Sequence, residues 1–319
     1  MSTAQVADTV RREWRLEVTA ARWVPDASPD WHLELEDGDG PRWTVTLHQA
    51  PTAADRAARL AAWQATGRLQ LGFAVAPVPT RDARVAVDVA PGLLLTLAPQ
   101  QTGEPFPAGS LPDDDARCQL ASALGELHSV AKPRRLPVWR PRVGRDSLTT
   151  LADLERCLGQ DNWDGGPWSG PASRLVSETR AVLGQALRRF RLLGAAVTGT
   201  PERWVVTHGA PYGGNLVRTA DGLRLLDWTQ LAVAPRERDL FDALGRAEGD
   251  EPWFAYLAAG GRPDPLAPDT VELFALERQL SVVCEHAVRF SRPHHDTEDD
   301  RRCFADLEQE LGTLVAGWT

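Results

Sequence analysis

The chain has 319 residues, of which 43% are hydrophobic and 25% are charged, a composition typical of a protein that folds around a buried core. Its formal net charge of −9 argues against binding to nucleic acid or to anionic membranes, which relies on clustered Lys and Arg. No apolar run reaches the ~18 to 20 residues that span a bilayer, and the polar start predicts no signal peptide. We therefore expect a cytoplasmic protein.

The N-terminal part of the chain alternates apolar and polar residues in short runs, which is the pattern of half-buried strands. Between the third and fourth runs, apolar residues recur at helical spacing from Ala53 to Trp63, and Gly67 is expected to end that helix. We predict a small lobe over residues 1–98 with one helix and a five-stranded sheet, its strands at residues 14–24, 30–37, 42–49, 84–90 and 92–99.

The pattern turns helical after residues 99–107, which are expected to form a hinge. Acidic residues at 113–115 precede apolar residues at helical spacing, and acidic side chains favour the first turn of a helix. Residues 161–171, rich in Pro, Gly and Trp, are expected to form a loop that packs on itself through its two Trp side chains. A larger, mainly helical lobe is predicted for residues 108–319, with further helices at 146–158, 172–195, 269–290 and 299–315.

Short strands are predicted on both sides of a polar loop, in the segments WVVTHG, NLVRT and LRLLDW. The loop reads His208-Gly209-Ala210-Pro211-Tyr212-Gly213-Gly214-Asn215, and Asp227-Trp228 follows at the end of the last strand. This pattern resembles the catalytic loop and metal-binding strand of the aminoglycoside phosphotransferase and choline kinase family, and the end of the chain resembles the bacterial spectinomycin-type branch.

The resemblance implies an α+β, bilobal protein-kinase-like fold, with ATP and Mg²⁺ as cofactors. It implies that Asn215 and Asp227 hold the metal, that His208 shapes the loop and that Asp239 steadies it. An amide oxygen and a carboxylate are ligands that Mg²⁺ accepts. Because Asp227 ends an apolar strand, we also expect its carboxylate to be buried, which is costly unless it binds something.

Two positions depart from the family pattern. Ala210 stands where the catalytic carboxylate belongs, and Thr46 stands where the third strand carries the Lys that grips the nucleotide phosphates. Tyr212 is the nearest substitute base, although its ordinary pKa near 10 makes it a poor one. His48 lies on the same face of the strand as Thr46 and is a candidate for contact with a phosphate, although it is a weak cation at neutral pH. No Gly-rich loop precedes the second strand, where VPDASPD is found instead.

Three hypotheses about function follow. The first, which we favour, is a pseudokinase that binds a nucleotide, a small molecule, a peptide or a partner enzyme, in natural-product biosynthesis. The alternative is an active ATP-dependent phosphotransferase that acts on a hydroxyl of a small molecule, an antibiotic or a peptide. The third is an active enzyme whose carboxylate was replaced by Ala210 through engineering, which leaves Thr46 unexplained.

Overall fold

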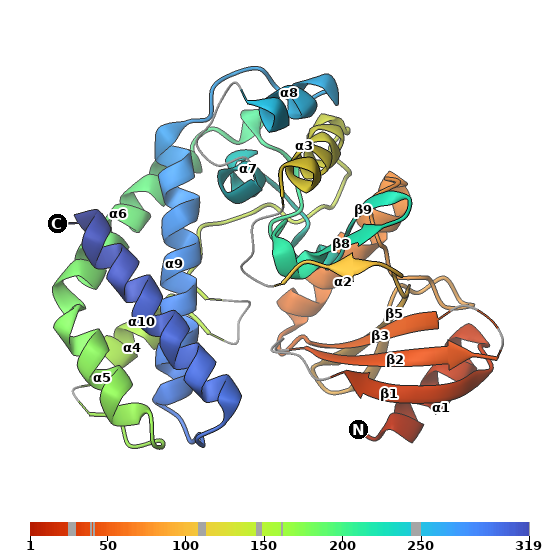
Figure 1. The fold of residues 1–319 in the computed structure, drawn as a ribbon, viewed down its shortest axis with the longest axis horizontal. Helices are drawn as coiled ribbons and strands as arrows, with labels where there is room; N and C mark the ends of the chain where they lie inside the picture. Colours follow the sequence, from red (N-terminus) through yellow and green to blue (C-terminus); the bar gives the residue numbers. More distant parts are fainter. Residues whose placement is uncertain are drawn as a thin grey trace. The chain divides into compact units, whose positions relative to one another are not determined.

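A computed structural model of the chain forms two compact units, each described by itself (Figure 1). The first unit comprises residues 1–139 and 203–265, and the second comprises residues 140–202 and 266–319. The predicted sheet and the predicted site loop both belong to the first unit, while the lobe boundaries at residues 98 and 107 stay a prediction. The structure describes residues 1–24, 30–38, 40, 42–107, 113–144, 149–160, 162–243 and 250–318.

A five-stranded antiparallel sheet dominates the N-terminal part of the first unit, as predicted. The strands follow the order β1-β2-β3-β5-β4. Their bounds are Val18–Val24 for β1, Trp31–Asp37 for β2, Arg42–Gln49 for β3, Val87–Ala90 for β4 and Leu93–Pro99 for β5. The alternation of the sequence gives the sheet an apolar face and a polar face.

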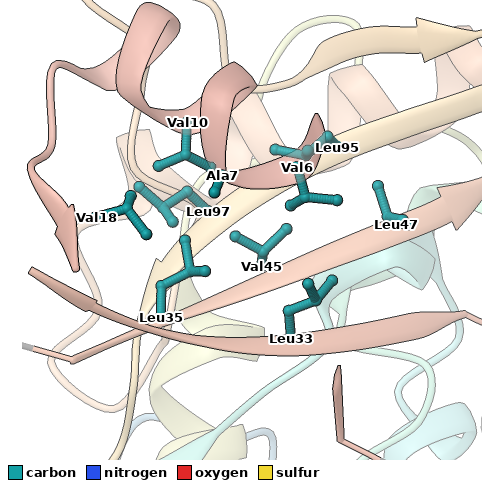
Figure 2. Close-up of a cluster of buried hydrophobic side chains, with 10 residues drawn as sticks. All are labelled: Val6, Ala7, Val10, Val18, Leu33, Leu35, Val45, Leu47, Leu95 and Leu97. Carbon is teal, nitrogen blue, oxygen red and sulfur yellow. The ribbon is translucent and has the colours of Figure 1, made fainter. Parts of the chain in front are cut away.

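The apolar face is covered by α1 (Thr3–Trp14), whose residues Val6, Ala7 and Val10 point at the strands (Figure 2). A capping box formed by Ser2 and Gln5 starts this helix. Helix α1 was not predicted, so residues 1–98 contain two helices, α1 and α2, where one was expected. The strand side chains of this core are Val18, Leu33, Leu35, Val45, Leu47, Leu95 and Leu97.

The helix predicted between the third and fourth strands is α2 (Ala53–Leu69), which starts with a Thr52–Asp55 capping box. The prediction that Gly67 ends it is wrong: the helix continues through Gly67 and ends where Gln70 adopts a left-handed conformation. The Trp63 ring of α2 lies 4.7 Å from the ring of His48 on β3. This contact brings α2 to the polar side of the sheet.

The rest of the first unit carries the site loop. The expected hinge, residues 99–107, contains the short strand β6 (Glu104–Pro105), which pairs with β8. Two further pairs of strands, β7 with β10 and β8 with β9, hold the two ends of the loop segment. The elements are α3 (Asp114–Ser129), β7 (Val205–Thr207), β8 (Leu216–Thr219), β9 (Gly222–Leu225), β10 (Ala232–Ala234), α7 (Glu237–Ala243) and α8 (Glu251–Ala258), with single turns η1 (Pro201–Arg203), η2 (Gly213–Asn215) and η3 (Trp228–Gln230).

The second unit is helical, and α9 packs against α4, α5, α6 and α10. The single helix predicted at 172–195 is two helices, because the chain leaves helical geometry at Thr179. In the described part of the chain, no helix combines the length and the apolar composition needed to cross a membrane. The bounds are α4 (Leu151–Leu158), α5 (Ser169–Glu178), α6 (Arg180–Val197), α9 (Pro268–Phe290) and α10 (Glu298–Trp318).

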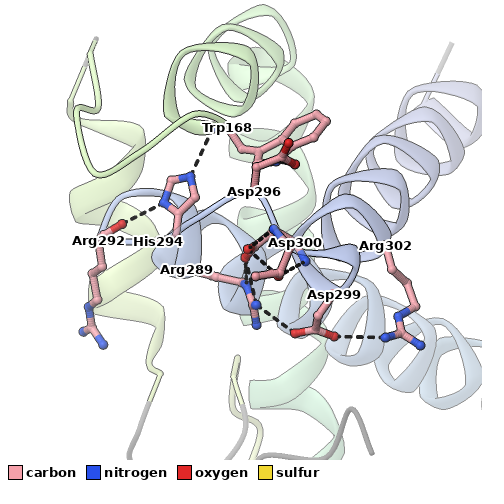
Figure 3. Close-up of polar contacts among 9 residues, drawn as sticks. Trp168, Arg289, Arg292, His294, Asp296, Asp299, Asp300 and Arg302 are labelled. Carbon is pink, nitrogen blue, oxygen red and sulfur yellow. Dashed lines mark hydrogen bonds and ion pairs between the residues drawn. The ribbon is translucent and has the colours of Figure 1, made fainter.

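Trp168 of the Trp-rich loop packs against a residue outside the loop. The Trp168 ring lies 4.9 Å from the ring of Phe304 in α10, and its backbone amide donates to His294 (Figure 3). His294 in turn donates through its backbone to the carbonyl of Gly165. The loop is therefore fixed by the segment that joins α9 to α10, because that segment offers the polar partners that a Gly-rich loop lacks.

Candidate active site

His208 follows β7 directly and is completely buried. Its Nε2 donates to the carbonyl oxygen of Leu226 over 2.8 Å, and its Nδ1 accepts from the amide of Ala210 at 3.2 Å. Burial lowers the pKa of His208 below its ordinary value. The imidazole is thus neutral and joins the two ends of the site segment, which matches the architectural role expected for it.

The carboxylate of Asp239, also fully buried, accepts from the backbone amides of His208 and Gly209, each over 2.7 Å. Its Oδ2 lies 3.1 Å from Nε2 of His128, whose other ring nitrogen contacts the Tyr256 hydroxyl. Burial alone would raise the pKa of Asp239, but the bond to His128 and the neighbouring charges hold it below its ordinary value. Asp239 therefore fixes the start of the loop as an ionised group.

Gly209 adopts φ of +95°, and a Cβ atom there would lie 2.4 Å from the guanidinium carbon of Arg238. The Arg238 guanidinium is held by Thr207 Oγ1 at 3.2 Å and by the carbonyl of Gln230 at 2.9 Å. A side chain at position 209 is excluded both by the backbone conformation and by this contact.

Ala210 is 3% exposed, so its methyl group is enclosed by the loop. Its carbonyl oxygen accepts from the Asn215 side-chain nitrogen at 2.9 Å and from the Tyr212 amide at 3.0 Å. The loop closes through its own backbone and the Asn215 amide, without a carboxylate at position 210. Asn215 Oδ1 is the side-chain oxygen left for a ligand.

Asp227 is exposed, and the expectation that its carboxylate is buried is wrong. The chain turns at Asp227 with φ of +52°, which carries the side chain out of the apolar row of β9. Its Oδ1 accepts from the amide and hydroxyl of Thr229, at 3.2 and 2.6 Å. Asp227 thus starts the η3 turn and forms part of the wall of a cavity.

This cavity has a volume of about 490 Å³ and lies between the polar face of the sheet and the end of the site loop, within the first unit. Pockets of a few hundred Å³ with mixed walls are typical of small-molecule sites. Asn215 and Asp227 both belong to its wall, as do Thr46 and His48, whereas Ala210 and Tyr212 do not. The structure thus brings four of the predicted site residues together.

Thr46 occupies the middle of the polar face, in register with His32 on β2 and Thr96 on β5. Its hydroxyl lies 3.1 Å from His32 Nδ1. His48 is buried, with Nδ1 at 2.8 Å from Asp30 Oδ2 and Nε2 at 3.0 Å from Thr96 Oγ1. Both ring nitrogens of His48 are therefore engaged within the protein, and the idea that His48 meets a phosphate loses support.

Several polar residues beside the cavity were not among the predicted site residues. Asp30 and Glu34 lie on its wall, and Arg59 of α2 approaches Asp30 to 4.0 Å from behind. The alternation in DWHLELED could have placed His32 and Glu34 on the face of Thr46. The segment 25–29, where the family's loop was sought, lies outside the described residues.

The sequence and the fold are similar to those of known phosphotransferases. A profile of the phosphotransferase enzyme family matches residues 24–273, which is most of the chain. The chain belongs to this family. Protein StrN of Streptomyces griseus is 28% identical over 247 residues, covering 75% of this chain and 72% of StrN.

Solved structures show the same fold. A spectinomycin phosphotransferase, APH(9)-Ia, in complex with ADP and spectinomycin, aligns with a TM-score of 0.74 at 12% identity over 99% of this chain and 98% of its own. A microcompartment-associated aminopropanol kinase aligns at 0.63 with 17% identity, covering 98% and 96%. Choline kinase LicA from Streptococcus pneumoniae aligns at 0.57 with 11% identity, covering 97% and 98%. The kinase-like fold and the family expected from the sequence are confirmed.

The residues on the wall fit one divalent cation of the Mg²⁺ type. Mg²⁺ is usually held by one or two carboxylates together with water and substrate phosphates, and Asp227 with Asn215 Oδ1 offers such a set. No group of three or more His, Cys, Asp and Glu side chains suited to a metal occurs in the part of the chain that the structure describes. The protein alone therefore offers only part of a coordination shell.

Proposed function

We propose that this chain is a catalytically impaired member of the phosphotransferase family, which binds a small ligand in the cavity beside Asn215 and Asp227. The observation that carries the proposal is Ala210, a buried methyl group at the position of the family's catalytic carboxylate. Loss of a positioned general base costs typically ~10² to 10⁴ in rate. Tyr212, the nearest substitute base in the loop, is not on the cavity wall.

Thr46 supports the proposal independently. Phosphoryl transfer depends on cations that neutralise the phosphates, among them a Lys on the third strand. Thr46 carries no charge, and its hydroxyl is engaged with His32. A missing base and a missing cation affect different parts of the reaction, so a change at one position does not compensate for the other.

The retained metal residues favour a second candidate, an active O-phosphotransferase. Asp227 and Asn215 would hold Mg²⁺, which when bound offsets the negative charge of phosphate groups. In that case His208 and Asp239 keep the loop in shape, and Asn215 positions the backbone of Ala210. The acceptor hydroxyl then lacks a carboxylate partner, and for this reason we rank this candidate second.

Turnover of Mg-ATP with spectinomycin and with choline as acceptors tests the proposal. We expect no phosphorylated product from the natural chain, and at least ~10²-fold faster ATP turnover from the double variant Ala210→Asp, Thr46→Lys. Adding Asp227→Asn to the double variant should abolish that gain, which shows that the turnover comes from this site. Phosphorylated acceptor from the natural chain, at a rate similar to that of the double variant, would overturn the proposal.

A further inference from the structure

The ion pair next to the cavity has the opposite orientation to the one in protein kinases. There, the third strand supplies a Lys and the helix supplies the Glu that pairs with it, so the cation faces the nucleotide. Here the helix α2 supplies the cation, Arg59, and the carboxylate of Asp30 lies 4.0 Å from it. Asp30 lines the cavity, whereas Arg59 does not. The anion therefore faces the ligand.

Asp30 is held firmly in this position. Its Oδ2 accepts from His48 Nδ1 at 2.8 Å, and its Oδ1 accepts from the backbone amide of Gln49 at 3.2 Å. Its side chain is 15% exposed and that of Arg59 is 7% exposed, so water screens the pair only weakly. The carboxylate of Asp30 is therefore held in a fixed position on the cavity wall.

The remaining charges on the wall have the same sign. Besides Asp30, the wall carries the carboxylates of Glu34 and Asp227, together with two His side chains. No Lys or Arg lines the cavity among the residues that the structure describes. Glu34 is paired with Arg22, as Asp30 is with Arg59, and neither Arg is on the wall. Both pairs therefore present their carboxylate to the cavity, and Asp227 adds an exposed one.

Gln100 on the wall holds Glu34 through a hydrogen bond. Gln100 donates through Nε2 to Glu34 over 2.9 Å, while its Oε1 is buried and has no partner within the described structure. This oxygen has no exposed surface, so it does not face the cavity. Gln100 therefore helps to hold the carboxylate of Glu34 in place, and donor groups on a ligand are favoured at the wall carboxylates.

We propose that the cavity binds a nucleoside-sized organic cation, with its positive group near Asp30 and Asp227, in preference to a nucleotide. This inference rests on the proposed function, since it names the ligand class of the same cavity. The volume of about 490 Å³ and the apolar residues Val75, Ala98 and Leu226 on the wall suit a flat ring system. The two carboxylates repel a phosphate when no metal is present and attract an ammonium group.

A matched series of adenosine derivatives tests the ligand class. Calorimetry in the presence of EDTA compares adenosine, AMP and 5′-amino-5′-deoxyadenosine, which share the nucleoside and differ in the group on the 5′ carbon: a neutral hydroxyl, an anionic phosphate and a cationic ammonium. We expect the ammonium compound to bind about tenfold more tightly than adenosine, and AMP about tenfold more weakly. Tighter binding of AMP than of the ammonium compound, equal binding of all three, or no binding of the ammonium compound at about 1 mM would overturn the inference.

Substitutions test whether Asp227 and Thr46 determine the preference for the ammonium compound. Asp227→Asn removes one exposed carboxylate and should reduce the preference for the ammonium compound several-fold, and Thr46→Lys should reverse the order so that AMP binds best. Asp82→Asn is the matched control, because Asp82 is an exposed carboxylate of the same unit that does not line the cavity. Unchanged order in both site variants would also overturn the inference. The titrations contain neither metal nor acceptor, so the turnover assay can fail or succeed independently of them.

Discussion

The side-chain nitrogen of Asn215 donates a hydrogen bond to the carbonyl oxygen of Ala210 over 2.9 Å. This bond joins the two ends of the site loop at the position where the family has its carboxylate. Together with the bond from the Ala210 amide to His208 Nδ1, it satisfies both backbone polar groups of a buried residue. The loop can therefore keep its shape when the chemistry of position 210 is lost.

Asn215→Ala removes this bond and leaves the carbonyl of Ala210 with one partner fewer. We expect the free energy of unfolding to fall by about 1 kcal/mol, the usual contribution of one hydrogen bond. Urea titration measures the change, and Asn162→Ala, at an exposed position in the second unit, is the control that should leave stability unchanged. If both variants are as stable as the natural chain, the bond does not hold the loop.

Gly209→Ala should destabilise the protein strongly. The new methyl group would meet the Arg238 guanidinium at 2.4 Å, at a backbone φ of +95°, and Arg238 is held in place by Thr207 and Gln230. We expect a loss of about 2 to 3 kcal/mol.

The same substitution at Gly67 should have the opposite sign. Gly67 lies inside α2 with no atom near its missing side chain, so Gly67→Ala should stabilise by about 0.5 to 1 kcal/mol. The melting temperature should fall in the Gly209→Ala variant and rise in the Gly67→Ala variant. A stable Gly209→Ala variant would contradict the described contact with Arg238.

The sequence predicted those parts of the fold whose pattern is local. Alternation along β3 placed Val45 in the core and Thr46 on the opposite face, because a strand turns successive side chains to opposite sides. The helix α3 followed from its acidic start and apolar period. The helix α1 was missed, because its few apolar residues become informative only when the sheet beneath them is known.

Partners that are distant in the sequence could not be predicted. Arg59 and Asp30 are far apart along the chain, and neither position matches a family motif, so their pairing depends on how α2 packs beside the sheet. The expected burial of Asp227 failed for a related reason. The apolar run before it suggested a buried end, but the left-handed turn at Asp227 leaves this residue exposed on the cavity wall.

Asp239→Ala should be among the most damaging substitutions in the first unit. It would leave the amides of His208 and Gly209 and the Nε2 of His128 without their acceptor. Breaking such a buried network costs about 3 to 5 kcal/mol. Asp239→Asn keeps one oxygen acceptor and should cost less. Urea midpoints of the two variants measure the difference, and equal, small losses would show that the carboxylate does not fix the loop.

Acidification should destabilise the protein through His208. Burial lowers its folded-state pKa below the ordinary value of 6.5, so below that value the unfolded chain binds a proton that the folded chain does not. The contribution of His208 is therefore fully present above about pH 6.5 and decreases as the pH falls, by at most about 1.4 kcal/mol for each pH unit. Asp239, whose pKa is also lowered, adds a second loss only below its ordinary value of 3.8.

His208→Gln isolates the first of these effects. Gln can donate to the carbonyl of Leu226 but does not titrate, so the unfolding free energy of this variant should fall less steeply between about pH 6.5 and pH 4.5. His295→Gln, at an exposed position, is the matched control and should keep the slope of the natural chain. Urea titrations at several pH values give the slopes. If the unfolding free energies of His208→Gln and of the natural chain fall in parallel as the pH is lowered, burial does not hold the His208 imidazole neutral.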